Sequence, residues 1–296
     1  MKKKILFAFF GTPELTLTVL DELARNGYMP EVIVTMPDRP SGRKMVIAPP
    51  PTKVWAESHG IPTLQPEKID EEFLDAFAKY DVNLGIVVAY GKILPQKLLD
   101  MPAWGMINIH YSLLPKYRGA TPVESAILAG EDTTGVSIQK IEFKLDSGPL
   151  LAKEETAIHH DETAPALRSR LNDMAKVLLI ATIRNIEEGK ARHIPQNEGD
   201  ATFSKKIKKE DGLVDLADDP FTLWRKYKAY YAWPKLYFFK EERDGKKRVI
   251  ITKASFVDGS FVIEKVTPEN KKEMDYSAYQ KSLKHASKKG KEDPHP

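Results

Sequence analysis

The first two-thirds of the chain alternates between apolar runs and amphipathic stretches. Residues 4–10, Lys-Ile-Leu-Phe-Ala-Phe-Phe, are apolar almost throughout, which is typical of a parallel strand buried on both faces. Gly11-Thr-Pro13 favours a turn and a helix start, and the following stretch predicts a helix to about Arg25. Residues 31–35 are predicted to form a second strand. This order indicates a βαβ unit, but the glycine turn lacks the G-x-G-x-x-G pattern that binds a pyrophosphate, so a dinucleotide site is disfavoured.

The same alternation continues to about residue 189. Further helices are predicted over residues 52–59, 69–79, 121–129 and 163–189, and further strands over residues 82–89, 106–110, 135–141 and 149–155. The last helix carries an apolar stripe that we expect to face the core, at Leu167, Leu171, Met174, Leu178 and Ala181. Pro37 to Pro51 is predicted to be a long loop. The pattern predicts an α/β protein with a Rossmann-like, doubly wound, mostly parallel sheet.

The pattern changes from about residue 190. A polar connector at 195–200 and a helix at 221–230 precede short predicted strands at 235–239, 247–254 and 260–266. Short, closely spaced strands are typical of a small β-barrel, here OB-like. The sequence thus predicts a first domain over residues 1–190, a linker over 191–207 and a C-terminal β-barrel domain over 208–296, with a loosely held tail after Leu283.

Composition excludes several classes of protein. The chain has 296 residues, of which 42% are hydrophobic and 29% charged, and it has no cysteine. Disulfides and thiolate metal sites are therefore excluded, which fits a cytoplasmic location. No run of about 18 apolar residues is present, and Lys2 to Lys4 are not followed by the features of a signal peptide, so we expect no membrane association.

The charge is unevenly distributed. The net charge is only +3, but residues 203–296 contain 22 Lys+Arg against 15 Asp+Glu, a balance of +7, whereas residues 1–202 contain 23 against 27, a balance of −4. A basic C-terminal part favours contact with a nucleic acid. A lysine-rich solvated surface gives the same balance.

Candidate chemistry lies at the end of one predicted strand. Residues 106–110 alternate in polarity, and because side chains two apart on a strand share a face, Asn108 and His110 project together. Pro115 and Gly119 bracket the loop that follows, so the pair is predicted near the carboxyl end of a strand, where open α/β sheets bind ligands. Taken alone, the pair is also compatible with a core histidine and a strand-end asparagine.

Two other polar groups have simple structural interpretations. Asp146 lies in Lys144-Leu-Asp-Ser-Gly148, a sequence typical of a turn. Beside His110, however, its carboxylate would favour the charged imidazolium and fix its tautomer. His159-His-Asp161 lies in a polar hinge without further ligands, so exposed loop residues are favoured there over a metal site.

These motifs together resemble a known family. Asn108-Ile-His110, Ser112-Leu-Leu-Pro115, Arg118-Gly119 and Leu145-Asp-Ser-Gly148 are similar in order and spacing to formyltransferases that use 10-formyltetrahydrofolate, above all to those acting on methionyl-tRNA. The resemblance also includes residues 9–13, 36–43, 88–91, 201–204 and 265–272, and thus nearly the whole chain.

The resemblance implies roles for particular residues. It places Asn108, His110 and Asp146 as the catalytic trio. The expected folate contacts are Ser112, Leu113, Leu114 and Pro115 by resemblance, and Tyr90, Gly91, Ile93 and Leu94 because the loop after the strand at 82–89 lies beside the Asn108 strand in a doubly wound sheet. The expected tRNA contacts are Arg39, Arg43 and Lys44.

The activity implied by the resemblance is transfer of a formyl group from 10-formyltetrahydrofolate to the free amino group of initiator methionyl-tRNA, for translation initiation, without a metal or an obligate protein partner. Two alternatives remain: a folate-dependent sugar-nucleotide N-formyltransferase and a noncatalytic RNA-binding protein on the same scaffold. Tyr111, Leu216 and Ala232-Trp-Pro-Lys235 depart from the family pattern, and Tyr111 is expected to narrow the pocket.

Overall fold

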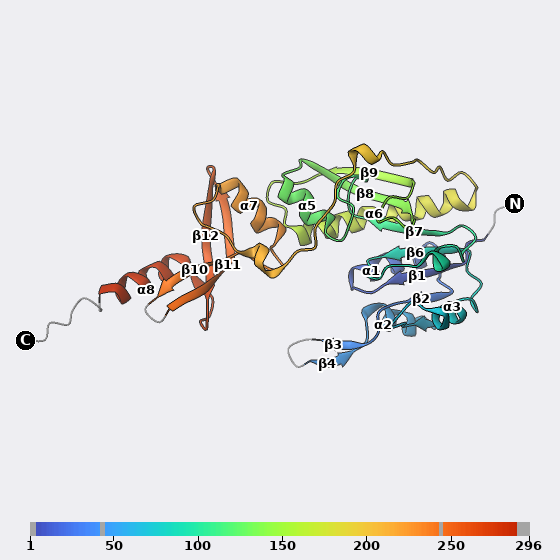
Figure 1. Cartoon of the computed structure of the whole chain (residues 1–296), viewed down its shortest axis with the longest axis horizontal. Helices are drawn as coiled ribbons and strands as arrows, with labels where there is room; N and C mark the ends of the chain where they lie inside the picture. Colours follow the sequence, from blue (N-terminus) through green and yellow to red (C-terminus); the bar gives the residue numbers. More distant parts are fainter. Residues whose placement is uncertain (1–3, 42–44, 243–244, 289–296) are drawn as a thin grey trace, which may run out of the picture. The chain divides into compact units, whose positions relative to one another are not determined.

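The computed structural model describes residues 4–41, 45–242 and 245–288 (Figure 1). Its backbone contacts divide the chain into two compact units. The first comprises residues 1–122, 133–157 and 168–204, and the second comprises residues 123–132, 158–167 and 205–296. Each unit therefore combines segments that are far apart in the sequence.

The first unit is built on a seven-stranded sheet. Its strands, in the order β5-β2-β1-β6-β7-β8-β9 across the sheet, are β5 (Thr63–Leu64), β2 (Val32–Val34), β1 (Phe7–Gly11), β6 (Leu84–Val88), β7 (Met106–His110), β8 (Thr133–Lys140) and β9 (Leu150–Ala157). The five strands β5, β2, β1, β6 and β7 run parallel to one another. β8 pairs antiparallel with both β7 and β9. The predicted Rossmann-like, mostly parallel sheet is confirmed.

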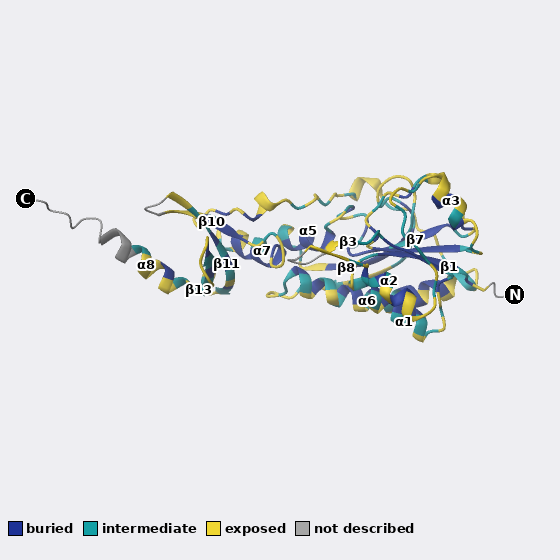
Figure 2. Ribbon diagram, turned by 90° about the horizontal axis from the view of Figure 1, so that it is seen from below, coloured by how far each residue is buried: buried dark blue, intermediate teal, exposed yellow. Residues whose placement is uncertain are grey.

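Helices lie on both sides of this sheet. They are α1 (Leu15–Arg25), α2 (Pro51–Ser58), α3 (Glu71–Phe77), α4 (Gln96–Leu99) and α6 (Ala164–Glu187), while α5 (Pro122–Ala129) belongs almost entirely to the second unit. Figure 2 shows α3 on one side of the sheet and α1, α2 and α6 on the other. Phe10 is fully buried and packs against Phe77 of α3. Phe9, its neighbour in β1, is fully buried as well. Alternate residues face opposite layers, which explains why β1 is apolar throughout.

Two predictions in the first unit are wrong. The long loop predicted between Pro37 and Pro51 contains an antiparallel hairpin, β3 (Arg39–Ser41) and β4 (Val46–Ala48), which leaves the sheet beside α2 (Figure 1). Its prolines, which lack a backbone N–H and are disfavoured within strands, favoured a loop in the sequence-based prediction. On α6 the apolar row that is fully buried comprises Leu167, Leu171, Ala175, Leu179 and Ile183. Of the expected stripe, Leu167 and Leu171 therefore face the core, whereas Met174 and Leu178 are half-buried and Ala181 is exposed.

The second unit contains a smaller, antiparallel sheet. Its elements are η2 (Lys209–Gly212), α7 (Pro220–Ala229), β10 (Tyr237–Glu242), β11 (Gly245–Val257), β12 (Ser260–Pro268), β13 (Met274–Asp275) and α8 (Tyr276–Lys288). The order β10-β11-β12-β13 leaves β10 and β13 at the edges of an open sheet in the part of the chain that is described. The predicted β-rich part is therefore present, but the predicted barrel is not, because β10 and β13 do not pair with each other among the described residues. Helix α8 continues to Lys288, beyond Leu283, where the loosely held tail was predicted to begin; the rest of that tail, residues 289–296, lies outside the described residues.

The predicted connector is part of the first unit as far as Ser204. Ile194 forms a β-bridge with Leu150, and Phe203 forms one with Arg118. Among the described residues, no helix is long and apolar enough to cross a membrane.

Candidate active site

The candidate site lies where the parallel half of the sheet meets the antiparallel half. β7 pairs with β6 on one side and β8 on the other, so Asn108 stands between Val87 and Gln139. His110 is opposite Ser137. Residues directly opposite one another share a face of the sheet, so Asn108, His110 and Gln139 present their side chains on the same side. The predicted pairing of Asn108 with His110 on one face is thus present.

The loop after β7 is fixed to β8 by one buried serine. The Ser137 hydroxyl donates to the Ser112 carbonyl (2.7 Å) and accepts from the Leu114 amide (3.1 Å). The Ser112 hydroxyl in turn donates to the Lys116 carbonyl (2.6 Å). These bonds define the path of the chain directly beyond His110.

His110 is buried and has a defined tautomer. Its Nε2 lies 2.9 Å from the carbonyl oxygen of Tyr117, and because a carbonyl can only accept, Nε2 carries a proton. Its Nδ1 lies 3.7 Å from Oδ2 of Asp146. The ring nitrogen available for acid–base chemistry is therefore Nδ1, and it faces a carboxylate.

Asp146 is held in a tight turn. Its Oδ2 accepts from the Gly119 amide (2.7 Å) and its Oδ1 accepts from Nε2 of Gln139 (2.8 Å). Its backbone has φ of 47°, a conformation that Asp adopts more readily than most residues. A Cβ at Gly148 would stand only 1.8 Å from the Lys140 carbonyl oxygen, so this turn can close against β8 only with glycine. The structure brings all three predicted catalytic residues to one place.

Asn108 differs from its two neighbours in having no hydrogen-bond partner for its side chain among the described residues. It is partly exposed, whereas His110 is buried. Its amide can therefore donate to a ligand without first breaking a bond inside the protein.

The predicted folate-contact residues fall into two groups. Ser112, Leu114, Tyr90 and Leu94 are buried, and the Tyr90 ring packs against Phe10. Ile93 is 87% exposed, Gly91 is exposed with φ of 86°, and Leu113 and Pro115 are partly exposed. Only the second group presents side chains or a bare backbone to a ligand; the first supports them.

Of the predicted tRNA-contact residues, Arg39 lies on the β3–β4 hairpin. Arg39 begins β3, where its guanidinium contacts the Glu67 carboxylate at 2.6 Å. Arg43 and Lys44 lie outside the described residues. Tyr111 does not narrow the site as expected, because its hydroxyl donates to Asn172 of α6 (2.8 Å), on the opposite face from His110.

Some contributors to the site were not predicted from the sequence. Gly119 and Tyr117 act through backbone groups, which a residue pattern does not reveal. Gln139 was expected only to flank the site, with Val136 and Ile138; the structure shows in addition that it lies opposite Asn108 and that its amide donates to Asp146.

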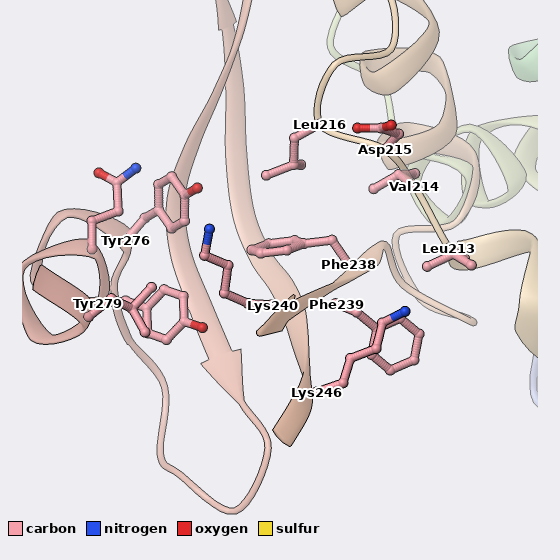
Figure 3. Close-up of a pocket in the computed structure, with 12 residues that line it drawn as sticks. Leu213, Val214, Asp215, Leu216, Phe238, Phe239, Lys240, Lys246, Tyr276 and Tyr279 are labelled. Carbon is pink, nitrogen blue, oxygen red and sulfur yellow. The ribbon is translucent and has the colours of Figure 1, made fainter. Parts of the chain in front are cut away.

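Other clusters of the described chain do not form part of this site. No group of three or more His, Asp or Glu side chains is arranged to hold a metal among the described residues. His160 contacts Asp161 (2.7 Å) on the surface, as expected. A pocket of about 850 Å³ is lined wholly by residues of the second unit, from β10, β11, α8 and the segment 213–216, and contains none of the trio (Figure 3).

Comparisons with known proteins show the family of this chain. The family described as "Formyl transferase" matches residues 3–183, and "Formyl transferase, C-terminal domain" matches residues 206–261. The chain therefore belongs to the formyl transferase family. It is similar to methionyl-tRNA formyltransferase from Thermus thermophilus (43% identity over 233 residues, 78% of this chain and 75% of the relative) and to that from Halalkalibacterium halodurans (40% over 230 residues, 77% and 73%).

Solved structures share the fold. A sugar N-formyltransferase from Shewanella has a TM-score of 0.66 with 15% identity, over 86% of this chain and 98% of that chain. HypX from Aquifex aeolicus in complex with tetrahydrofolic acid has a TM-score of 0.65 with 15% identity, over 95% of this chain. This chain spans about half the length of HypX (48%).

Proposed function

We propose that this chain transfers the formyl group of 10-formyltetrahydrofolate to the free amino group of initiator methionyl-tRNA, as a cytoplasmic enzyme of translation initiation. The observation that carries the proposal is the convergence of Asn108, His110 and Asp146 at the carboxyl end of β7. The similarity to methionyl-tRNA formyltransferases at 40–43% identity over most of the chain supports the choice of substrate.

The reaction needs a hydrogen-bond donor that stabilises the negative charge developing on the formyl oxygen, and a base that carries one proton. As the amine attacks the formyl carbon, the formyl oxygen gains negative charge, and the Asn108 amide, which has no partner among the described residues, stabilises that charge. Nδ1 of His110 takes the proton that the amine loses and returns it to N10 of the folate as the C–N10 bond breaks. The Asp146 carboxylate, 3.7 Å from Nδ1, stabilises the imidazolium between these two steps.

The folate contacts are part of the same proposal. Ile93 offers an exposed apolar side chain, and Gly91 offers backbone without a Cβ, which is the chemistry that a flat heteroaromatic ring requires. Leu113 and Pro115, both partly exposed, extend this surface from the other loop. The folate supplies the formyl group, and no residue of the chain needs to form a covalent intermediate.

The tRNA contacts are assigned to two regions. We propose that Arg39, Arg43 and Lys44 hold the tRNA near its acceptor end, and that the basic domain over residues 208–296 faces the rest of the tRNA. The balance of +7 over residues 203–296 supports this assignment. A sugar-nucleotide substrate is the second candidate, supported by the likeness in fold to sugar N-formyltransferases at only 15% identity.

The test is a direct assay of both acceptors. The protein is incubated with 10-formyltetrahydrofolate and either initiator methionyl-tRNA or an amino-sugar nucleotide, and the formylated product is measured. We expect formylmethionyl-tRNA to form at least about 10²-fold faster than the formylated sugar. Faster formylation of the sugar nucleotide would replace the proposed substrate.

A further inference from the structure

The segment over residues 194–204, here called the strap, joins two parts of the site. At its start Ile194 exchanges two backbone hydrogen bonds with Leu150 of β9 (2.8 and 2.9 Å). At its end Thr202 accepts from the Arg118 amide (2.8 Å), and the Ser204 amide donates to the Arg118 carbonyl (2.7 Å). The strap is thus paired with β9 at its start and with the loop that follows β7 at its end.

One side chain of the strap holds the Asp146 turn. Nε2 of Gln196 donates to the backbone carbonyls of Asp146 (2.9 Å) and Gly148 (2.7 Å). The same nitrogen lies 3.4 Å from Oε1 of Gln139, whose own amide nitrogen holds the Asp146 carboxylate. Both protons of a single amide group are therefore used on the turn, on either side of Ser147.

Arg118 determines which way this amide faces. Its guanidinium is fully buried, and Nε (3.2 Å) and Nη2 (2.9 Å) both donate to Oε1 of Gln196. A guanidinium has no acceptor, so the amide oxygen must face Arg118 and the amide nitrogen must face the turn. Nη2 also donates to Glu198 of the strap (2.8 Å), so the cation has an anionic partner.

We propose that Gln196, oriented by Arg118, is a positioning residue that holds Asp146 in the place from which its carboxylate faces His110. The catalytic consequence rests on the proposed formyl transfer. The carboxylate is fixed by Gly119 and Gln139, but these bonds require the backbone of the turn to stay where it is. Gln196 supplies that restraint, and a shift of about 1 Å in a reacting group is enough to slow an enzyme markedly.

The two hydrogen bonds from Gln196 to the carbonyls of Asp146 and Gly148 are here called the clamp. Two substitutions separate the effect of the clamp from the effect of the contact with Arg118. Gln196→Glu keeps an oxygen for Arg118, which favours the ionised carboxylate, but it has no proton to donate to the two carbonyls. Gln196→Met removes both the clamp and the contact with Arg118, and it keeps a side chain of similar length. Asn197→Ala is the matched control, because Asn197 is exposed on the same strap and its side chain bonds only Gly199 and Asp200 among the described residues.

Three quantities are measured for each protein: the melting temperature, amide hydrogen exchange of the peptide over residues 141–149, and kcat per folate-binding site. We expect Gln196→Glu to melt within about 2 °C of the wild type, because one stabilising contact replaces another. Its turn should exchange about 10-fold faster, and kcat should fall about 10-fold with both KM values within about two-fold. Gln196→Met should show the same losses and also melt lower, and Asn197→Ala should match the wild type.

The outcomes that overturn the inference are distinct from failure of the proposed function. Wild-type exchange in residues 141–149 of Gln196→Glu shows that the turn does not depend on the clamp. Faster exchange with unchanged kcat shows that the restraint does not serve catalysis. If the wild type formylates a different amine, kcat is measured with that substrate; if it formylates none, the proposed function fails while the exchange data still decide whether Gln196 holds the turn.

Discussion

His110 presents Nδ1 to the carboxylate of Asp146 at 3.7 Å, because its Nε2–H is already donated to the Tyr117 carbonyl. This separation is longer than a hydrogen bond but within the range of an ion pair. Asp146 therefore acts on the ring through its charge, while Tyr117 fixes the tautomer. Because the tautomer is fixed by a backbone carbonyl, a substitution of Asp146 removes the charge facing the ring without removing the contact that fixes its tautomer.

Asp146→Asn should slow formyl transfer without loss of substrate binding. The amide has nearly the same shape but no charge, so an imidazolium at His110 loses its stabilising partner. We expect kcat to fall on the order of 10²-fold, about 3 kcal/mol of transition-state stabilisation, with little change in KM. Melting temperature and single-turnover formylation are measured on the same preparation. Normal turnover per folded molecule would leave Asp146 as a turn residue only.

Asn108→Ala should lower the rate of formyl transfer while leaving the stability of the fold almost unchanged, whereas a core mutation would mainly lower stability. The Asn108 side chain is partly exposed and has no partner among the described residues, so the free energy of unfolding should change by less than about 0.5 kcal/mol. Loss of a donor to the formyl oxygen should lower kcat by about 10²–10³-fold. Urea denaturation and steady-state kinetics test both statements. A stable variant with wild-type kcat would remove Asn108 from the mechanism.

Tyr90→Phe should be stabilising and should not weaken folate binding. The Tyr90 hydroxyl is buried and has no hydrogen-bond partner among the described residues, so its removal should stabilise the fold by about 1 kcal/mol. Burial also raises the pKa of Tyr90 from 10.0 to about 12. The wild type should therefore lose more stability than the variant as the pH rises from about 10 towards 12, because only the wild type has the contribution of Tyr90 to this loss. Urea midpoints at pH 7 and pH 11 measure the effect; weaker folate binding would instead place the hydroxyl in the ligand site.

Arg43→Ala should weaken the use of tRNA while folate binding is retained. Contacts to phosphate release counterions, so the KM for tRNA should rise steeply with salt in the wild type, and the slope against log salt should fall by about one for the variant. The KM for the folate serves as the internal control. Loss of folate binding instead would make the hairpin a cover for the cofactor, and a tRNA affinity that is independent of salt would argue against phosphate contacts altogether.

Glu198 should contribute to stability only above acidic pH. Hydrogen bonds from Arg118 and then Lys144 lower the pKa of Glu198 from 4.5 to about 2. A lowered pKa gives stability that is present above about pH 4.5 and is lost as the pH falls towards 2. The difference in urea midpoint between the wild type and Glu198→Gln should therefore shrink between pH 6 and pH 2.5. A constant difference would show that the ion pair does not contribute. The side chain is half exposed, so the expected effect is small.

Local patterns in the sequence determined most of the first unit. The uniformly apolar run of β1 required burial on both faces, and the alternation over residues 106–110 placed Asn108 and His110 on one face. Both follow from side-chain geometry within a strand, which depends only on neighbouring residues. The same kind of pattern was not sufficient on α6, where the buried row continues from Leu171 through Ala175 and Leu179 rather than through Met174 and Leu178.

Only the tertiary structure decided how the site is assembled. The distance between His110 and Asp146 depends on the antiparallel pairing of β7 with β8 and on the turn closed at Gly148. Gln196 lies 50 residues from Asp146 in the sequence, within a stretch whose polar composition predicted only a connector. Such contacts arise from strand order, register and the path of the chain after α6, and none of these leaves a periodic signal in the residues themselves.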